Sequence, residues 1–312
     1  VAAMIANALQ KNGFKTGLFT SPWVTEYREQ IQINGEFIPK SDFAEYVAAY
    51  KDADATEFEL LTAIMYKYFA DKSVDYAVVE CGMGGLEDST NAFSHPELAV
   101  ITCVAMDHMN FLGKALSEIA VQKAGIIKNN SVCVLYPNPK CEDVFENRCA
   151  ETGSRLIKIA DYGDFKLNNL KTAEAALNFL NVKIAPALPK LPARTEMLAS
   201  NVMVDGAHNE NGANALEKSL PHKNITAVVG MMADKDYDSY LRIIGPHCKK
   251  IIATTPSNSR ALPAERLAEA ARKYCGDVSN PEKALQFARE DFEFLLVCGS
   301  FYLARDLRKY LL

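Results

Sequence analysis

The sequence predicts an α/β protein with two parallel-sheet domains. Apolar runs of strand length alternate with helical patterns, and such an alternation is typical of βαβ units. The alternation is interrupted at the proline-rich stretch IAPALPKLPAR and then restarts, which predicts a linker near residues 185–195. A length of 312 residues also favours two domains. We therefore expect domains at 1–188 and 189–312, the second being the smaller.

Helices are predicted where apolar residues recur at helical spacing. The first, VAAMIANALQKNGF, ends at Gly13, and two more follow with Ser41 and Thr56 as expected N-caps. ALSEIAVQKAGIIK predicts a helix that stops at Gly125. The remaining expected helices are LKTAEAALNFLNV, ENGANALEKSL and PAERLAEAARKY.

Strands are predicted at short apolar runs that end in turn-forming or polar residues. The continuous apolar character of YAVVECG predicts a parallel strand buried on both faces. ELAVITCVAMDH predicts another, ending in Asp107-His108. The other expected strands are Gly17–Phe19, SVCVLY, NVMVDGAHN, ITAVVGMM, KKIIATTP and FEFLLVCGS.

Composition narrows the class of protein. With 49% hydrophobic and 23% charged residues the chain is an ordinary globular one, and a net charge of −5 argues against a nucleic-acid partner while allowing a small anionic substrate. No apolar run reaches the ~18 residues of a membrane helix and we find no signal peptide, so we expect no membrane partner and a cytoplasmic location. The eight cysteines form no CxxC pair, which predicts reduced thiols. Those expected to be buried in apolar segments are Cys81, Cys103, Cys133 and Cys298.

Polar side chains follow three predicted strands of the N-terminal domain. Ser21, Glu80 and His108 stand where the strands end, and ligands of open α/β sheets lie beyond that edge. A hydroxyl, a carboxylate and an imidazole there form a candidate divalent-cation site, although imidazole is the least typical ligand for Mg²⁺. The glycines of the CGMGG stretch after Glu80 would let backbone approach a phosphate or the waters of the metal. Two simpler alternatives remain open: Glu80 as a cap of the next turn, and His108 as a buried structural histidine.

Ordered motifs over nearly the whole chain resemble the folylpolyglutamate synthase/dihydrofolate synthase family, relatives of the Mur amino-acid ligases. The matching stretches are LFTSP, REQIQING, VVECGMGGLEDSTN, AMDH followed by LG, QKAGIIK, PARTE, VDGAHN, ADKDY, RALPAE and CGSFYLA. The resemblance implies an N-terminal P-loop-type parallel-sheet ATPase domain that binds Mg-ATP and folate. It implies a C-terminal Rossmann-like glutamate-ligase domain.

The resemblance also implies a metal site. Ser21, Glu80 and His108 match the family's magnesium ligands, and Lys123 matches a lysine that is carbamylated in the family. An ammonium beside Mg²⁺ would repel the cation, whereas a carbamate can coordinate it. Two magnesium sites are expected, and Lys123, His108 and Arg194 are the expected catalytic residues.

For the nucleotide, the resemblance implies contacts from both domains. Asn169 matches an ATP-contacting asparagine, and Arg194 matches an arginine that reaches the ATP phosphates. Asp205 and His208 match residues that close over the nucleotide. An alternative for Asp205 and for Asn209 is a strand-to-helix turn with N-capping, and both roles can hold at once.

The folate is expected near the loop after TSP, formed by Ser21, Pro22 and Trp23. An aromatic ring there could stack on a flat pterin, worth roughly 0.5–1.5 kcal/mol beyond its buried area. Simple packing of Trp23 is an equal alternative.

The implied reaction is the ATP-dependent addition of L-glutamate to the γ-carboxylate of a folate through an acyl phosphate, by a monomer. Dihydropteroate is an open second substrate. The family's P-loop, GTNGKGS, stands directly before the helix that here begins at Val1, and no GxxxxGKS or GxxxxGKT occurs in the 312 residues. We expect residues omitted upstream to supply it.

Three rival interpretations remain. A dinucleotide-dependent oxidoreductase would need GxGxxG, which GMGGLE does not match. A Mur-type ligase acting on a cell-wall nucleotide is closer, but REQIQING and RALPAE favour the folate branch. A non-catalytic nucleotide- or folate-binding remnant is the third.

Overall fold

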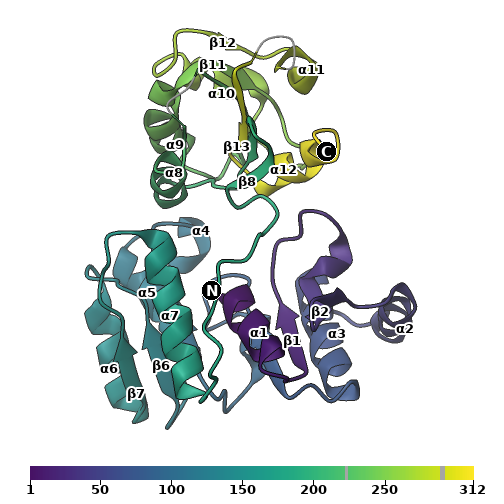
Figure 1. Cartoon of the computed structure of the whole chain (residues 1–312), viewed down its shortest axis with the longest axis vertical. Helices are drawn as coiled ribbons and strands as arrows, with labels where there is room; N and C mark the ends of the chain where they lie inside the picture. Colours follow the sequence, from purple (N-terminus) through teal and green to yellow (C-terminus); the bar gives the residue numbers. More distant parts are fainter. Residues whose placement is uncertain (222–223, 289–291) are drawn as a thin grey trace. The chain divides into compact units, whose positions relative to one another are not determined.

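The computed structural model describes residues 1–221, 224–288 and 292–312. The chain divides into two units, Val1–Pro189 and Lys190–Leu312, and each is considered by itself. Figure 1 shows that both units combine strands with helices packed against them, so the predicted α/β class is confirmed.

The first sheet of unit 1 has the strand order β3-β2-β1-β4. Its strands are β1 (Thr16–Phe19), β2 (Ile31–Ile33), β3 (Glu36–Phe37) and β4 (Tyr76–Val79). β4 runs parallel to β1, while β2 and β3 form an antiparallel hairpin that the sequence analysis did not predict. The hairpin turns at Asn34-Gly35, both with positive φ (51° and 80°), as a two-residue loop between twisted strands requires.

The prediction that β4 is buried on both faces is wrong. Ala77 is exposed and the other three residues are half-buried. Within the described sheet β4 is the last strand in the order and pairs with β1 alone. An end strand is covered less completely than a central one, and this explains the exposure.

The second sheet of unit 1 is parallel, in the order β5-β6-β7. Its strands are β5 (Ala99–Ile101), β6 (Val132–Leu135) and β7 (Arg155–Lys158). The strand predicted to end at Asp107-His108 therefore ends at Ile101. The Asn138 side chain explains this, because it accepts the Val104 N–H (2.8 Å) and donates to the Thr102 carbonyl (3.0 Å). These backbone groups are thus bound by a side chain instead of a neighbouring strand.

Because the chain leaves the sheet after Ile101, one cysteine is more exposed than we expected. Cys103 is exposed, contrary to expectation, whereas Cys133 and Cys298 are buried and Cys81 is half-buried. All of the cysteines are free thiols.

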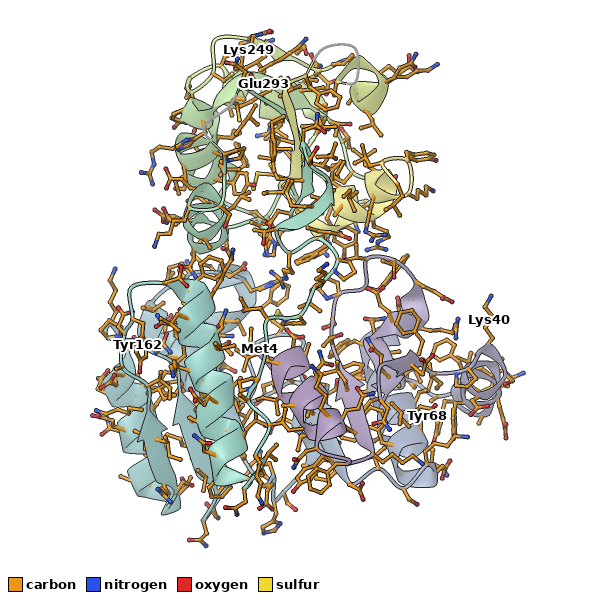
Figure 2. All side chains as sticks on the ribbon, viewed as in Figure 1. Met4, Lys40, Tyr68, Tyr162, Lys249 and Glu293 are labelled. Carbon is orange, nitrogen blue, oxygen red and sulfur yellow. The ribbon has the colours of Figure 1, made fainter. Side chains whose placement is uncertain are left out.

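The helices of unit 1 are α1 (Ala2–Lys11), α2 (Lys40–Tyr50), α3 (Glu57–Asp71), α4 (Met109–Leu112), α5 (Leu116–Ala124), α6 (Glu142–Thr152) and α7 (Phe165–Phe179), with 3-10 turns η1 (Tyr27–Gln30) and η2 (Ser89–Ala92). Met4 of α1, labelled in Figure 2, belongs to the same buried core as Leu177 of α7. Gly125 ends α5 as predicted. None of the helices in the described ranges is long and apolar enough to cross a membrane.

One of the two predicted N-caps is confirmed and the other is wrong. Thr56 caps α3, accepting the Glu59 N–H while the Glu59 carboxylate accepts the Thr56 N–H, which is a capping box. The Ser41 prediction is wrong: an N-cap at Ser41 would start α2 at Asp42, but α2 begins two residues earlier, at Lys40, with Pro39 as its N-cap. Ser41 lies inside the first turn, and its hydroxyl donates to Asp42 instead.

Unit 2 contains one six-stranded sheet in the order β12-β11-β10-β13-β9-β8. Its strands are β8 (Glu196–Ala199), β9 (Val202–Val204), β10 (Ile225–Val229), β11 (Cys248–Ala253), β12 (Val278–Ser279) and β13 (Phe294–Cys298). The pairings are parallel except that β8 is antiparallel to β9. Every residue of β9, β10 and β13 is buried.

The helices of unit 2 are α8 (Glu210–Glu217), α9 (Tyr237–Ile244), α10 (Ala264–Ala271), α11 (Ala284–Ala288) and α12 (Phe301–Arg308), with a 3-10 turn η3 (Gly245–His247). Figure 1 shows α8 and α9 on one face of the sheet and α12 on the other. The side chains of α8, α9 and α10 form one core with β10 and β11. The sheet is therefore covered on both faces.

Candidate functional site

Ser21 and Glu80 lie at one edge of the first sheet. β1 and β4 are parallel with Phe19 opposite Val79, so both strands reach their carboxyl ends together. The Glu80 N–H continues the ladder by donating to the Phe19 carbonyl at 3.0 Å. The structure thus brings a hydroxyl and a carboxylate to neighbouring strand ends.

The glycines after Glu80 fit closely against the helices of unit 1. A Cβ on Gly82 would lie 2.4 Å from the Phe58 ring, and one on Gly85 would lie 2.9 Å from the Gln122 carbonyl. The Leu86 N–H also donates to that carbonyl, at 2.7 Å. These contacts revise the sequence interpretation: this loop needs glycine to pack on α3 and α5, whatever ligand it meets.

Glu80 and Lys123 both influence the pKa of the Cys81 thiol. Burial raises the pKa of the Cys81 thiol, a hydrogen bond from Thr90 and the Lys123 ammonium lower it, and the carboxylates of Asp88 and Glu80 raise it further. Lys123 stands in the last turn of α5 and is half-buried. Glu80 and Lys123, from separate elements, thus both lie near enough to Cys81 to influence its thiol.

Asp88 is a residue that the sequence analysis did not single out. Its carboxylate accepts the Met83 N–H at 2.7 Å and the Thr90 N–H at 3.0 Å, which holds the glycine loop closed. The available signal was its position before Ser-Thr, typical of a cap at a helix start.

His108 precedes α4 in a left-handed conformation (φ 50°). Its N–H donates to the Asp107 carboxylate at 2.8 Å, and its Nε2 lies 3.8 Å from the same oxygen. A Cβ on Gly84 would lie 2.7 Å from the side chain of Leu112, the last residue of α4. His108 is thus not at a strand end, but α4 connects it to the loop that follows Glu80.

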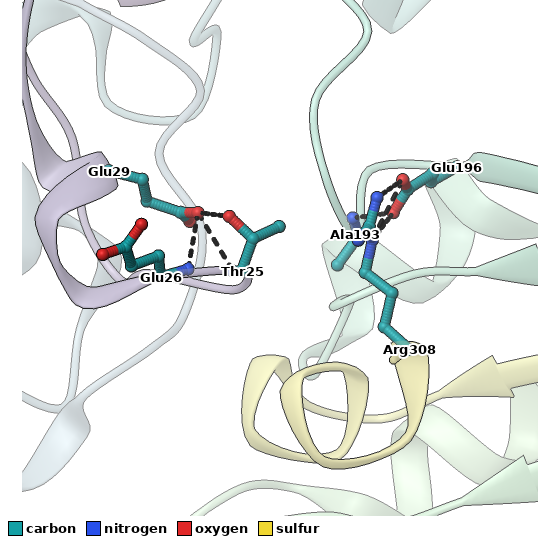
Figure 3. Close-up of polar contacts among 6 residues, drawn as sticks. All are labelled: Thr25, Glu26, Glu29, Ala193, Glu196 and Arg308. Carbon is teal, nitrogen blue, oxygen red and sulfur yellow. Dashed lines mark hydrogen bonds and ion pairs between the residues drawn. The ribbon is translucent and has the colours of Figure 1, made fainter. Parts of the chain in front are cut away.

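The loop after β1 is held by one carboxylate. Glu29 accepts the backbone N–H groups of Thr25 (2.9 Å) and Glu26 (3.2 Å), as Figure 3 shows. It also accepts the N–H of Val24, at 2.6 Å. Pro22, just before this loop, is exposed. Consecutive N–H groups gathered on an anion form a rigid turn.

Trp23 packs edge-on against Tyr27, with ring centroids 6.0 Å apart. Tyr27 is fixed in turn, since its hydroxyl donates to Glu57 at 2.8 Å. Burial and the Glu57 carboxylate both raise the Tyr27 pKa. Trp23 thus makes a packing contact with Tyr27, while stacking on a pterin stays a prediction.

Asn169 is half-buried in the first turns of α7. The neighbouring Asn168, which the sequence analysis did not consider, is buried and anchors the preceding loop. Its amide donates to Asp161 at 2.9 Å and accepts the Tyr162 N–H at 2.9 Å. Successive helical residues point about 100° apart, so Asn169 leaves α7 in a different direction from this anchor.

In unit 2, Asp205 follows β9 and ties two backbone segments together. Its carboxylate accepts the Thr195 N–H at 2.6 Å and the Ala207 N–H at 2.7 Å. Burial raises the pKa of Asp205, while these N–H groups and the charges of Arg194 and His208 lower it. Asp205 thus lies close to both other predicted residues of this unit.

Phe301 brings these residues together, and the sequence analysis did not assign it a role. The Arg194 guanidinium carbon lies 4.5 Å from the centroid of the Phe301 ring, and the His208 ring packs edge-on at 6.0 Å. A Cβ on Gly206 would lie 2.4 Å from this ring. The signal in the sequence was the CGSFYLA stretch, where Ser300 caps α12 directly after β13.

The tautomer of His208 follows from its contact. Its Nδ1 lies 2.9 Å from the Gly206 carbonyl, and a carbonyl can only accept, so Nδ1 carries the proton. In the neutral ring, Nε2 is then an acceptor. Asn209 caps α8 by accepting the Gly212 N–H at 2.8 Å, as predicted.

The acidic and histidine side chains alone do not make a metal cage. Among residues 1–221, 224–288 and 292–312 there is no group of three or more His, Cys, Asp or Glu side chains that could hold a metal ion. A cation here would need oxygen ligands from outside these residue types.

Comparison with known proteins covers the whole chain. Residues 1–207 match the Mur ligase middle domain, and residues 193–301 match the glutamate ligase domain of Mur ligases. The chain is 31% identical to the folylpolyglutamate synthase of Lacticaseibacillus casei over 378 residues, covering 100% of this chain and 87% of the relative.

Two solved structures are similar in fold. Escherichia coli FolC in complex with DHPP and ADP superposes with a TM-score of 0.88 at 25% identity, over 99% of this chain and 85% of FolC. The bifunctional folylpolyglutamate synthase/dihydrofolate synthase of Yersinia pestis, complexed with AMPPNP and Mn ion, also gives 0.88 at 24% identity, over 99% and 85%. At this identity, the similarity to the Y. pestis structure shows a shared fold and nothing further.

Proposed function

Because the chain belongs to the folylpolyglutamate synthase/dihydrofolate synthase family of Mur ligases, which are ATP-dependent glutamate ligases, we propose that it adds L-glutamate to the γ-carboxylate of tetrahydrofolates. The observation that carries the proposal is the match of both Mur ligase domains and of a folylpolyglutamate synthase across the full chain. The site geometry in each unit supports it.

In the proposed reaction, an oxygen of the γ-carboxylate attacks the γ-phosphorus of ATP and the bond to ADP breaks. The acyl phosphate that forms is then attacked by the amine of L-glutamate. An amide bond forms, phosphate leaves with the electron pair of the broken C–O bond, and the amine loses a proton. Such transfers depend on positioned charge more than on covalent work by side chains.

We assign the metal ligands to Ser21, Glu80, His108 and Lys123. The Ser21 hydroxyl and the Glu80 carboxylate supply the hard oxygens that Mg²⁺ prefers, and substrate phosphates usually complete its shell. Mg²⁺, when bound, supplies positive charge that neutralises the phosphate oxygens.

Lys123 is proposed to act as a carbamate. Its ammonium and the Glu80 carboxylate both act on the Cys81 thiol, so an unmodified Lys123 would place a cation beside the metal ligands. The ammonium first loses a proton to give the amine, and addition of CO₂ with loss of a second proton then gives a carbamate with one negative charge.

The nucleotide contacts are assigned to Asn169, Arg194, Asp205 and His208. Arg194, held over Phe301, would meet phosphate oxygens with its N–H groups, and the His208 ring lies against the same Phe301 side chain. Asp205 already accepts two backbone N–H groups, so its contribution is to hold the turn that carries Arg194.

The folate is assigned to the loop of Ser21, Pro22 and Trp23, kept rigid by Glu29. A second candidate activity is glutamate addition to dihydropteroate, because the family includes dihydrofolate synthases and the similar E. coli FolC binds DHPP.

The test is glutamate-dependent ADP release by the complete protein with ATP and Mg²⁺, comparing tetrahydrofolate with dihydropteroate. Release with tetrahydrofolate alone indicates a polyglutamate synthase, and release with both a bifunctional enzyme. Chelation of Mg²⁺ should abolish release. If the protein binds Mg-ATP but releases no ADP with either substrate, the proposal is contradicted. A non-catalytic remnant or a ligase for another acid is then favoured.

A further inference from the structure

The turn that carries Arg194 is built in an unfavourable backbone conformation. Ala193 (φ 52°) and Thr195 (φ 45°), on either side of Arg194, both lie in the left-handed region although neither is glycine. Such residues persist only where surrounding contacts over-determine them, and they gather at functional sites.

Besides the bond from the Arg194 N–H to the Leu191 carbonyl (3.3 Å), three hydrogen bonds to Asp205, Gly206 and Glu196 hold this turn in place. The Thr195 N–H donates to Asp205 at 2.6 Å, and the Gly206 N–H donates to the Ala193 carbonyl at 2.8 Å. The third runs from the Ala193 N–H to the Glu196 carboxylate at 2.9 Å. The first two come from the loop already described, whereas the third depends on a residue with no role so far.

Glu196 is held by Arg308 in a two-pronged ion pair. Arg308 Nη2 donates to Oε1 at 2.6 Å and Nε donates to Oε2 at 2.9 Å, the same oxygen that accepts the Ala193 N–H (Figure 3). Their side chains are only 17% and 19% exposed. The planar fork fixes the carboxylate's orientation, because both of its oxygens are bound at once.

Residues at both ends of α12 thus help to position Arg194. Phe301, the first residue of α12, lies against the guanidinium, and Arg308, the last, holds the carboxylate that anchors the turn. Backbone and side-chain tip of Arg194 are therefore set by the same rigid element.

We propose that Glu196 and Arg308 are positioning residues, which hold Arg194 ready for the phosphates of the nucleotide. The inference rests on the proposed function, in which Arg194 makes that contact. A preorganised donor stabilises developing charge without reorganising during the reaction. Without the pair the turn can relax, and the guanidinium is then spread over many positions.

The first test is a double-mutant cycle between Arg308→Met and Arg194→Ala in the complete protein, followed by kcat/KM for ATP. Arg308→Met should lower kcat/KM about tenfold in the wild-type background. It should lower it less than twofold when Arg194 is already Ala, since a positioning residue acts through the group it positions. An equal loss in both backgrounds would overturn the proposal.

The variant Arg308→Lys distinguishes a loss of positioning from a loss of folding. Lysine keeps the charge but not the fork, so Tm should stay within a few degrees while kcat/KM still falls several-fold. Wild-type kcat/KM in this variant would count against the proposal. Arg242→Met is the matched control, because it breaks the exposed Arg242–Glu210 pair of the same unit and should change neither quantity.

A crystal structure of Arg308→Met gives a readout independent of turnover. We expect Ala193 to leave the left-handed region and Arg194 to move from the Phe301 ring. Retention of both features would overturn the positioning role even in an inactive protein. Conversely, if Arg194→Ala alone keeps wild-type turnover and Mg-ATP affinity, the assignment of Arg194 to the nucleotide fails, whatever the pair does.

Discussion

The Arg194 guanidinium lies over the face of the Phe301 ring, with 4.5 Å between the guanidinium carbon and the ring centroid. An arginine on an aromatic face is restricted in direction and keeps its N–H groups available at its edge. Phe301 itself is 7% exposed and packs against Gly206, so the ring has little freedom to move.

Replacing Phe301 by leucine should weaken the use of ATP. Cation–π contacts contribute about 0.5–1 kcal/mol at exposed sites, so kcat/KM for ATP should fall about two- to fivefold in steady-state assays. Tyr302→Leu is the control, since it removes a similar contact, with Arg305 at 4.8 Å, on the same helix. Equal effects of both variants would show that the ring over Arg194 has no special role.

Asp205 should make unit 2 less stable as pH rises. Burial raises its pKa above the usual 3.8, so between pH 3.8 and the raised value the folded state binds more protons than the unfolded state. The Asp205 contribution to stability is therefore complete below pH 3.8 and is lost as pH rises through the folded pKa.

Asp205→Asn should remove this slope. We measure the unfolding free energy of wild type and variant by urea denaturation from pH 4 to 7. The value for the wild type should fall relative to that of the variant as pH increases. Loss of one acceptor for the Thr195 and Ala207 N–H groups adds a constant offset. A difference that is independent of pH would contradict a raised pKa.

Glu29→Gln should weaken folate binding selectively. The amide keeps one acceptor oxygen in place of a carboxylate that gathers three N–H groups, and bonds to a charged group contribute about 1.5–3 kcal/mol. KM for folate should rise about five- to tenfold while KM for ATP changes less than twofold, in the same steady-state assays. Glu36→Gln, at an exposed site in β3, is the control. If KM for folate stays unchanged, the loop does not bind the folate.

Thr56→Ala and Ser41→Ala form a matched pair for stability. Thr56 is the N-cap of α3, so its loss should cost about 1 kcal/mol of unfolding free energy. Ser41 lies inside the first turn of α2, and its replacement should stay within about 0.5 kcal/mol. Urea denaturation followed by circular dichroism measures both, and a larger cost for Ser41→Ala would make Ser41 the N-cap and place the α2 start two residues later, at Asp42.

Hydrophobic periodicity and capping are local signals, so the sequence alone was enough to locate many of the helices and strands, although it missed the β2–β3 hairpin. Thr56, Gly125 and Asn209 act at helix ends as their residue types predict. The parallel β1 and β4 also followed from pattern, and with them the meeting of Ser21 and Glu80 at one edge.

The tertiary structure decided what depends on residues far apart in the chain. β5 ends at Ile101 because Asn138 binds the backbone beyond it, and no periodicity within the strand reports that contact. The Arg194 turn is likewise held by Glu196 and by Arg308, 112 positions later in the chain. A sequence pattern can name Arg194, but only packing between distant segments fixes where its guanidinium lies, since that direction is set by contacts with α12 and not by its neighbours in the chain.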